Sequence, residues 1–237
     1  MKNQLDLLIE FTKDPDARSR ATAIAGLAKI ADPRGFAPVL VALFDPVDEV
    51  RIAAATALGV FADDRAFEPL VTCLDDPCEQ AAVNSVWALG QLPTAASTEK
   101  LIDVLETASF STALRTAAAT ALGERTESAA NSFLDDQALV SRAAAALLGA
   151  AAEQDDELRA TAVWALGHLP CTDESYIALE HALHDPYEWV VRYAIEALAN
   201  AGQERAITPL KQLSNHDCEA VRELSVQAVQ KIEGVLD

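Results

Sequence analysis

Residues 45–75 read DPVDEVRIAAATALGVFADDRAFEPLVTCLD, and other parts of the chain repeat this pattern. The unit predicts an amphipathic helix that ends within residues 59–64, followed by a shorter helix over residues 66–74. The apolar face of the first helix carries Val50, Ala54, Ala57, Leu58 and Phe61. One such helix pair cannot bury its apolar side alone, so it must stack on neighbouring copies.

The copies follow one another at a constant spacing of 31 residues. The markers that keep this step are the Asp-Pro pairs that begin at Asp14, Asp45 and Asp76, and the leucines Leu27, Leu58 and Leu89. Coincident markers at one spacing indicate a repeat architecture. We therefore predict an all-α fold, a right-handed α-α superhelix of about seven helix pairs, in which residues 1–237 form a single solenoid.

An arginine recurs six residues after the first aspartate of the unit. The pairs with this spacing are Asp14 and Arg20, Asp45 and Arg51, and Asp136 and Arg142, with Asp185 to Arg192 one residue longer and Asp217 to Arg222 one residue shorter. The aspartate is expected to be a helix N-cap, with the following proline at the first helical position. Stacked copies would let each arginine reach an aspartate of its own or the adjacent repeat, which predicts a structural ladder.

The spacing fails in the middle of the chain, near residues 124–154. Arg115 and Arg159 are 44 residues apart, which is 13 more than one unit. Either a degenerate short repeat lies at residues 127–149, or one repeat carries an insertion near residues 124–136. The spacing of Asp136 and Arg142 favours the first interpretation. An irregularity of this kind would bend the solenoid and divide it into two arms.

Composition excludes several classes of function. The formal net charge is −19, with 18 basic against 37 acidic residues, so the chain lacks the cations that a nucleic-acid-binding protein needs. No apolar run approaches the roughly 18 residues that span a bilayer, and no apolar signal core is present, so we expect no membrane insertion. The four cysteines form no CxxC motif, and a cytoplasmic, reduced protein is expected.

The aromatic residues provide the clearest indication of a binding site. Trp87 and Trp164 occupy the position of Thr56 in their own repeats, and Trp189 occupies that of Glu49, so all three tryptophans lie off the predicted core face. Exposed aromatic rings are enriched in binding hot spots. We predict an aromatic strip made of Trp87, Trp164, Tyr187, Glu188, Trp189, Arg192 and Tyr193. Alternatively, the tryptophans fill packing gaps between repeats.

No residues are assigned to catalysis. His181 and His184 lie three residues apart on one helix edge, but His168 is the only nearby third ligand, and histidines near a helix C-terminus are explained by the helix dipole. We therefore predict no metal site. No Gly-rich phosphate loop or recognisable Ser/His/Asp grouping occurs, and the cysteines are expected to be buried or partly buried thiols.

Two motifs indicate a family. The helix pair of about 31 residues with its Asp-Pro, Val-Arg and Ala-Leu-Gly signature, together with RAFEPL at residues 65–70, resembles HEAT-like repeats. Residues 185–194, DPYEWVVRYA, are similar to a stretch found in phycobilin lyases of the E/F type and related phycobilisome proteins, the phycobilisome-lyase class of HEAT-like repeats. The resemblance implies a curved α-solenoid whose concave face holds a partner.

Two functions follow from this resemblance. The first is a non-enzymatic interaction module, chaperone-like or scaffolding, that binds another protein, such as a phycobiliprotein or a second HEAT-like subunit, in a phycobilisome context. The alternative is a phycobilin lyase, or a subunit of one, which attaches a linear tetrapyrrole to a phycobiliprotein cysteine. In that case Arg192 and Arg159 would bind the bilin propionates and Glu188 would handle ring protons. No cofactor is expected, since the tetrapyrrole would be a substrate.

Overall fold

The chain folds into helices only. The computed structural model describes residues 3–125 and 135–234, and within them lie fourteen α-helices and no strand. The all-α fold predicted from the repeat is therefore confirmed. None of the helices in these two ranges is long and apolar enough to cross a membrane.

The contacts divide the chain into two compact units at residues 101 and 102, within α7 (Ala95–Glu106). The helices of the first unit are α1 (Gln4–Phe11), α2 (Ala17–Ile30), α3 (Phe36–Ala42), α4 (Asp48–Phe61), α5 (Phe67–Thr72) and α6 (Glu79–Gln91). Those of the second unit are α8 (Thr112–Glu124), α9 (Gln137–Ala150), α10 (Asp156–Leu166), α11 (Asp173–Ala182), α12 (Glu188–Ala201), α13 (Ile207–Gln212) and α14 (Glu219–Ile232).

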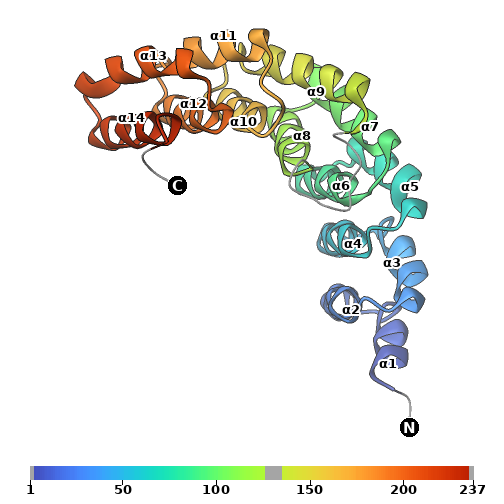
Figure 1. The fold of residues 1–237 in the computed structure, drawn as a ribbon. Coiled ribbons are helices and arrows are strands. Elements are labelled where there is room, and N and C mark those ends of the chain that lie inside the picture. The colour runs from blue at the N-terminus through green and yellow to red at the C-terminus, as the bar shows by residue number, and fades with distance from the viewer. Residues whose placement is uncertain (1–2, 126–134, 235–237) are drawn as a thin grey trace. The chain divides into compact units, whose positions relative to one another are not determined.

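Each unit has two layers of helices (Figure 1). One layer contains the first helix of each pair: α4 packs between α2 and α6 in the first unit, and α10 and α12 pack between α8 and α14 in the second. The other layer contains the second helices, including α3 and α5 in the first unit and α9, α11 and α13 in the second. We call these the first helices and the second helices.

The core lies between the two layers and is built from small side chains. On α4, the predicted apolar face is confirmed, since Val50, Ala54, Ala57 and Leu58 are all fully buried. Phe61 is half-buried and meets Phe36 edge to face, with ring centroids 5.9 Å apart. Alanine at the buried positions lets neighbouring first helices approach closely, which is why few aromatics suffice to fill this core.

Three first helices end in the same way. Their C-caps, Ala31, Ala62 and Gly202, occupy one repeat position and adopt left-handed backbone conformations, with φ of 51°, 47° and 63°. Each cap nitrogen donates a hydrogen bond to the carbonyl of the leucine four residues earlier. The left-handed residue turns the chain toward the second helix. At two of the three positions this residue is an alanine, whose Cβ makes the left-handed conformation less favourable than it is for glycine.

The helix packing explains the long spacing between Arg115 and Arg159. α8 packs directly on α10, as successive first helices do elsewhere, while α9 packs against α10 and α11 in the layer of second helices. α9 therefore takes the place of the second helix of the α8 repeat. Of the two proposed segments, residues 127–134 of the first (127–149) and residues 126–134 of the second (124–136) lie outside the described part of the chain.

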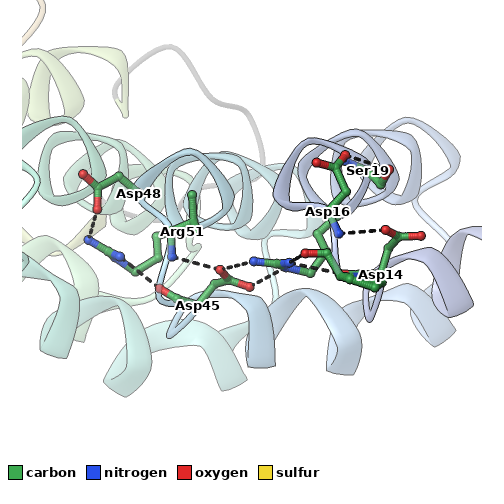
Figure 2. Close-up of polar contacts among 9 residues, drawn as sticks. Asp14, Asp16, Ser19, Asp45, Asp48 and Arg51 are labelled. Carbon is green, nitrogen blue, oxygen red and sulfur yellow. Dashed lines mark hydrogen bonds and ion pairs between the residues drawn. The ribbon is translucent and has the colours of Figure 1, made fainter.

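The predicted N-caps are wrong at Asp45 and Asp76, whereas Asp136 does cap α9 by accepting from the main-chain nitrogens of Ala138 and Leu139. Asp45 and Asp76 lie two residues before the residues that cap α4 and α6, and Pro46 does not enter the helix. Asp45 instead accepts a hydrogen bond at 3.0 Å from the main-chain nitrogen of Val47 (Figure 2). Asp76 accepts one at 2.8 Å from the main-chain nitrogen of Cys78. The aspartate thus forms a turn through one hydrogen bond, and its carboxylate can still accept hydrogen bonds from another partner.

That partner is the arginine of the preceding repeat. Arg20 binds Asp45 through Nη2 and Nε at 2.7 and 2.8 Å, and Arg51 binds Asp76 through the same two atoms at 2.8 and 2.6 Å. In both arginines the third nitrogen, Nη1, donates to a main-chain carbonyl six residues earlier at 2.9 Å. The predicted ladder therefore exists, and each arginine connects its own turn to the next repeat.

Two further rungs lie in the second unit. Arg159 binds Asp185 through Nε and Nη2, both at 3.0 Å. Arg115 binds Glu153 at 2.8 Å, so a glutamate replaces the aspartate where the spacing is longest. The pair Asp136 and Arg142 is not a rung, because Arg142 lies on the second helix α9.

The register corrects the two variants of the arginine spacing. We call the first residue of the turn the acid position and the residue six places later the arginine position. The acid position of the α14 repeat is His216, not Asp217, and the arginine position of α12 is the buried Val191, not Arg192. Similarly, Ala82 occupies the arginine position of α6, and the next acid position is Ser109.

The ion pairs of the ladder should contribute to the free energy of unfolding because their side chains are shielded from water. The side chains of Arg51 and Asp76 are only 11% and 6% exposed. Replacing Asp76 by alanine leaves a shielded guanidinium without its acceptor, so Asp76→Ala should lower the free energy of unfolding by about 2 to 4 kcal/mol. Urea unfolding followed by circular dichroism measures the change.

The matched control is Asp173→Ala, since Asp173 pairs with Arg205 at the surface and its side chain is 84% exposed. Hydrogen bonds from Arg51 lower the pKa of Asp76 in the folded state. The rung therefore stabilises the protein above the pKa of an unfolded aspartate, and its contribution is lost as the pH falls through the lower folded value. A destabilisation by Asp76→Ala that equals that of the control would contradict this account.

Candidate protein-interaction site

The residues of the predicted aromatic strip fall into two groups. Trp87 lies on α6 in the first unit, and the other six lie on α10 or at the start of α12 in the second unit. Within the first helices, all three tryptophans point away from the fully buried face, as the helical spacing predicts. Their surroundings differ, however, and this difference separates packing residues from surface residues.

Trp87 and Trp164 pack against glycines of the preceding first helix. The ring of Trp87 lies over Gly59 so closely that a Cβ added there would overlap it, and the ring of Trp164 lies over Gly123 in the same way. Both tryptophans are half-buried. Trp164 also stacks with His168, with ring centroids 4.5 Å apart. These two contacts match the alternative prediction, in which tryptophans fill gaps between repeats.

Trp189 is different because it is 45% exposed. The guanidinium of Arg192 lies 4.4 Å from the centre of its ring, and the ring of Tyr193 is tilted against it with a centroid distance of 5.8 Å. Arg192 also approaches Glu188, with Nη1 and Oε1 3.8 Å apart. We call Tyr187, Glu188, Trp189, Arg192 and Tyr193 the α12 surface.

The ladder holds the α12 surface in place. Tyr187 is the N-cap residue of α12, and its main-chain nitrogen donates to Asp185, the carboxylate that also binds Arg159. Burial and the bonds from Arg159 and Tyr187 act on Asp185 in opposite directions, and the bonds prevail, so its pKa is lowered. Asp185 is therefore ionised at neutral pH and fixes the first turn of α12.

A shift of one residue explains why an arginine lies on this surface. Val191 fills the arginine position and is fully buried, while Arg192 follows it at a position that carries Ile52 in the α4 repeat. The guanidinium thus stacks on Trp189 instead of entering the ladder, and its Nε is buried without a hydrogen-bond partner among the described residues. A cation held over an exposed tryptophan is a feature of interfaces.

The cysteines, histidines and carboxylates outside the α12 surface form no comparable cluster among the described residues. Cys73 is buried, and burial raises the pKa of its thiol to about 11, while Cys78, Cys171 and Cys218 are half-buried. A groove beside α10 is lined by Ile177 and His181 among others. Across residues 3–125 and 135–234, no group of three or more His, Cys, Asp or Glu side chains is arranged to hold a metal ion.

A sequence model of HEAT repeats matches residues 5–83 and 144–230, which together are more than half of the chain. The chain belongs to the HEAT-repeat family. No curated protein matches it in sequence.

Solved structures agree with this assignment at the level of the fold. The archaeal HEAT-like repeats protein from Thermococcus onnurineus NA1 aligns over 100% of both chains with 16% identity and a TM-score of 0.61. Two engineered proteins align over 98% of this chain, both with 20% identity: one over 68% of its own length with a TM-score of 0.61, the other over 100% with a TM-score of 0.50. Identities this low show a shared fold and leave function to the site itself.

Within a HEAT-repeat protein, the α12 surface is the part of the predicted strip that packing does not explain. Trp87 and Trp164 bury their rings against the preceding repeat, whereas Trp189 is 45% exposed and contacts Arg192 and Tyr193 of its own helix. The sequence signal for this distinction is a glycine in the preceding first helix, Gly59 for Trp87 and Gly123 for Trp164.

The glycines provide a test of the packing role. Gly59→Ala should lower the free energy of unfolding by about 1 to 3 kcal/mol, because the new methyl group overlaps the rigid ring of Trp87. Gly149→Ala is the matched control: it lies near the end of α9 with no atom within 4 Å, so the better helix former should leave stability unchanged or raise it. Chemical unfolding of both variants measures the difference, and equal effects would exclude a packing role for Trp87.

Proposed function

We propose that this HEAT-repeat protein is a non-enzymatic interaction scaffold that binds a partner protein through the α12 surface. The observation that supports this proposal is the exposed Trp189, in contact with both Arg192 and Tyr193 on the face of α12 turned away from the buried core. An ordered tryptophan–arginine–tyrosine cluster offers a large contact area at low conformational cost. HEAT solenoids use the faces of their repeats for such binding.

A phycobilisome partner is the more specific part of the proposal. In the stretch DPYEWVVRYA at residues 185–194, Asp185 belongs to the ladder and Val190, Val191 and Ala194 belong to the core, so the fold alone accounts for them. Trp189 and Tyr193 are not required by the fold. Because these two residues are part of the likeness to phycobilisome proteins, we propose a phycobiliprotein as the partner, and a second HEAT-like subunit as the other candidate.

Substitutions on the α12 surface test the scaffold. Trp189→Ala and Arg192→Ala should each weaken binding of a purified phycobiliprotein subunit by about tenfold or more, because each removes part of one stacked cluster. Isothermal titration calorimetry measures the affinity, and circular dichroism should show unchanged helicity.

The matched control is Phe44→Ala, which removes an aromatic ring that is 58% exposed in the first unit and lies outside the α12 surface. Its affinity should equal that of the unaltered protein. If both α12 variants bind normally, the α12 surface is not the binding site. If no phycobiliprotein binds the unaltered protein, the phycobilisome context is wrong, and the same variants can then be tested against a second HEAT-like subunit.

The alternative function, a phycobilin lyase, rests on the same sequence likeness. Its candidate residues are differently placed: Arg159 is bound to Asp185, Asp156 and two main-chain carbonyls, whereas Arg192 and Glu188 are on the α12 surface. Arg159 therefore has no free donors for a propionate, which favours the scaffold.

Co-expression with a bilin-producing system and a phycobiliprotein subunit separates the two functions. The scaffold predicts a complex that contains no newly attached bilin, because it binds the partner without transferring a group to it. The readout is zinc-enhanced fluorescence of the phycobiliprotein band after denaturing electrophoresis. A covalent fluorescent product that disappears with Arg192→Ala would establish the lyase instead.

A further inference from the structure

α1 packs on α2 as a second helix, and part of its apolar side is exposed. α1 packs on α2 as α3 packs on α4, and its residues align with those of α5, Leu8 with Leu70 and Phe11 with Cys73. Leu70 is fully buried and Cys73 is 5% exposed, but Phe11 is 48% exposed and Leu8 half-buried. A groove between α1 and α2 has an apolar part, formed by Leu8, Phe11 and Ala23, and a polar part, formed by Asp16, Arg18, Ser19 and Thr22.

The last described helix is a first helix without a second helix after it. Val226 of α14 takes the position of Ala55 on α4 and of Ile195 on α12, which are both fully buried. Val226 is 50% exposed. It lines a groove between α13 and α14 together with Leu210, Ser225 and Val229. This groove lies where the second helix of the α14 repeat would pack.

The ladder is unfilled at the same two ends, with opposite charges. Arg222 occupies the arginine position of α14, and its Nη1 donates to the carbonyl of His216 at 2.6 Å, as other rung arginines do. Among the described residues, no carboxylate binds its Nε and Nη2, the atoms that hold the acid in a complete rung. Asp14 occupies the acid position of α2, and its carboxylate accepts from the main-chain nitrogen of Asp16 at 2.8 Å (Figure 2). In the same part of the chain, an arginine reaches Asp14 only at its main-chain carbonyl, and none binds its carboxylate.

We propose that two copies of this chain associate head to tail, so that α14 of one copy and α1 of the next form one helix pair. α14 lies in the groove between α1 and α2, and α1 lies in the groove between α13 and α14. Arg222 of the first copy then binds Asp14 of the second with the geometry of Arg20 and Asp45. Apolar surface is buried at both grooves, and the ladder continues from one copy to the next.

This association is heterologous, because two different ends of the chain meet. Each copy keeps one free head and one free tail, so the contact permits chains longer than two copies. The average mass in solution should therefore rise steadily with protein concentration. A symmetric dimer would reach a plateau at two copies. The α12 surface takes no part in the contact, so this inference stands or falls independently of the proposed function.

Single charged substitutions in the two grooves test the contact. We call the groove between α1 and α2 the head and the groove between α13 and α14 the tail. Phe11→Glu should block the head and Val226→Glu should block the tail. Each substitution should weaken self-association by about tenfold or more, because a carboxylate would be buried without a partner. Both side chains are about half exposed in the single chain, so the variants should fold normally. Sedimentation equilibrium over a range of concentrations measures the mass.

The mixture of the two variants is the decisive measurement. Phe11→Glu retains an intact tail and Val226→Glu an intact head, so an equimolar mixture should form a dimer and nothing larger. Val41→Glu is the matched control, since Val41 is a valine that is 75% exposed on α3 and lies outside both grooves. It should associate like the unaltered protein.

Charge reversal tests the rung by itself. Asp14→Arg and Arg222→Asp should each reduce association, and the double variant should restore it, because the pair is then re-formed with the charges exchanged. A monomer at all concentrations overturns the proposal. Association that is insensitive to both groove variants, or a mixture that grows beyond the dimer, overturns it as well.

Discussion

The bidentate pairing between an arginine of one repeat and a carboxylate of the next sets the register of the repeats in each unit. The arginine uses three nitrogens at once, two for the carboxylate and one for a carbonyl of its own turn. The carboxylate in turn fixes the nitrogen two residues later, and so the start of the next first helix. A single ion pair therefore connects the turn of one repeat, the turn of the next and the helix that follows.

The pattern of missing rungs supports this account. Where the arginine position holds Ala82 or Val191, the next acid position holds Ser109 or His216. Neither a guanidinium nor a carboxylate is left without its partner at these places, as expected if an uncompensated, shielded charge is more costly than the loss of the pair. The two ends of the chain are the exceptions, with Asp14 at one and Arg222 at the other.

Much of this structure could be predicted from the sequence, because the same residue types recur at the same positions in successive repeats. The helix pairs, the buried face of α4 and the ladder all follow from the spacing of Asp45, Arg51 and Leu58. The helix starts could not be predicted, because the carboxylate of Asp45 has two possible uses, an N-cap and a rung, and only the neighbouring arginine decides between them. The same limit applies to the candidate site: the spacing placed Trp87 and Trp189 off the core face alike, but Gly59 lies under one ring and nothing comparable under the other.

The missing rung between α12 and α14 also means that some helices of the second unit unfold locally more easily than others. α14 is joined to α12 by apolar packing and by the exposed contact of Lys231 with Asn200, whereas α10 is fastened to the turn of α12 by Arg159. Local unfolding of this unit should therefore begin at α13 and α14. Amide protons should exchange soonest in these helices, and proteases should cut there first. Within the second unit, the helix that separates most readily from its neighbours is therefore also one whose apolar side is partly exposed, at Val226.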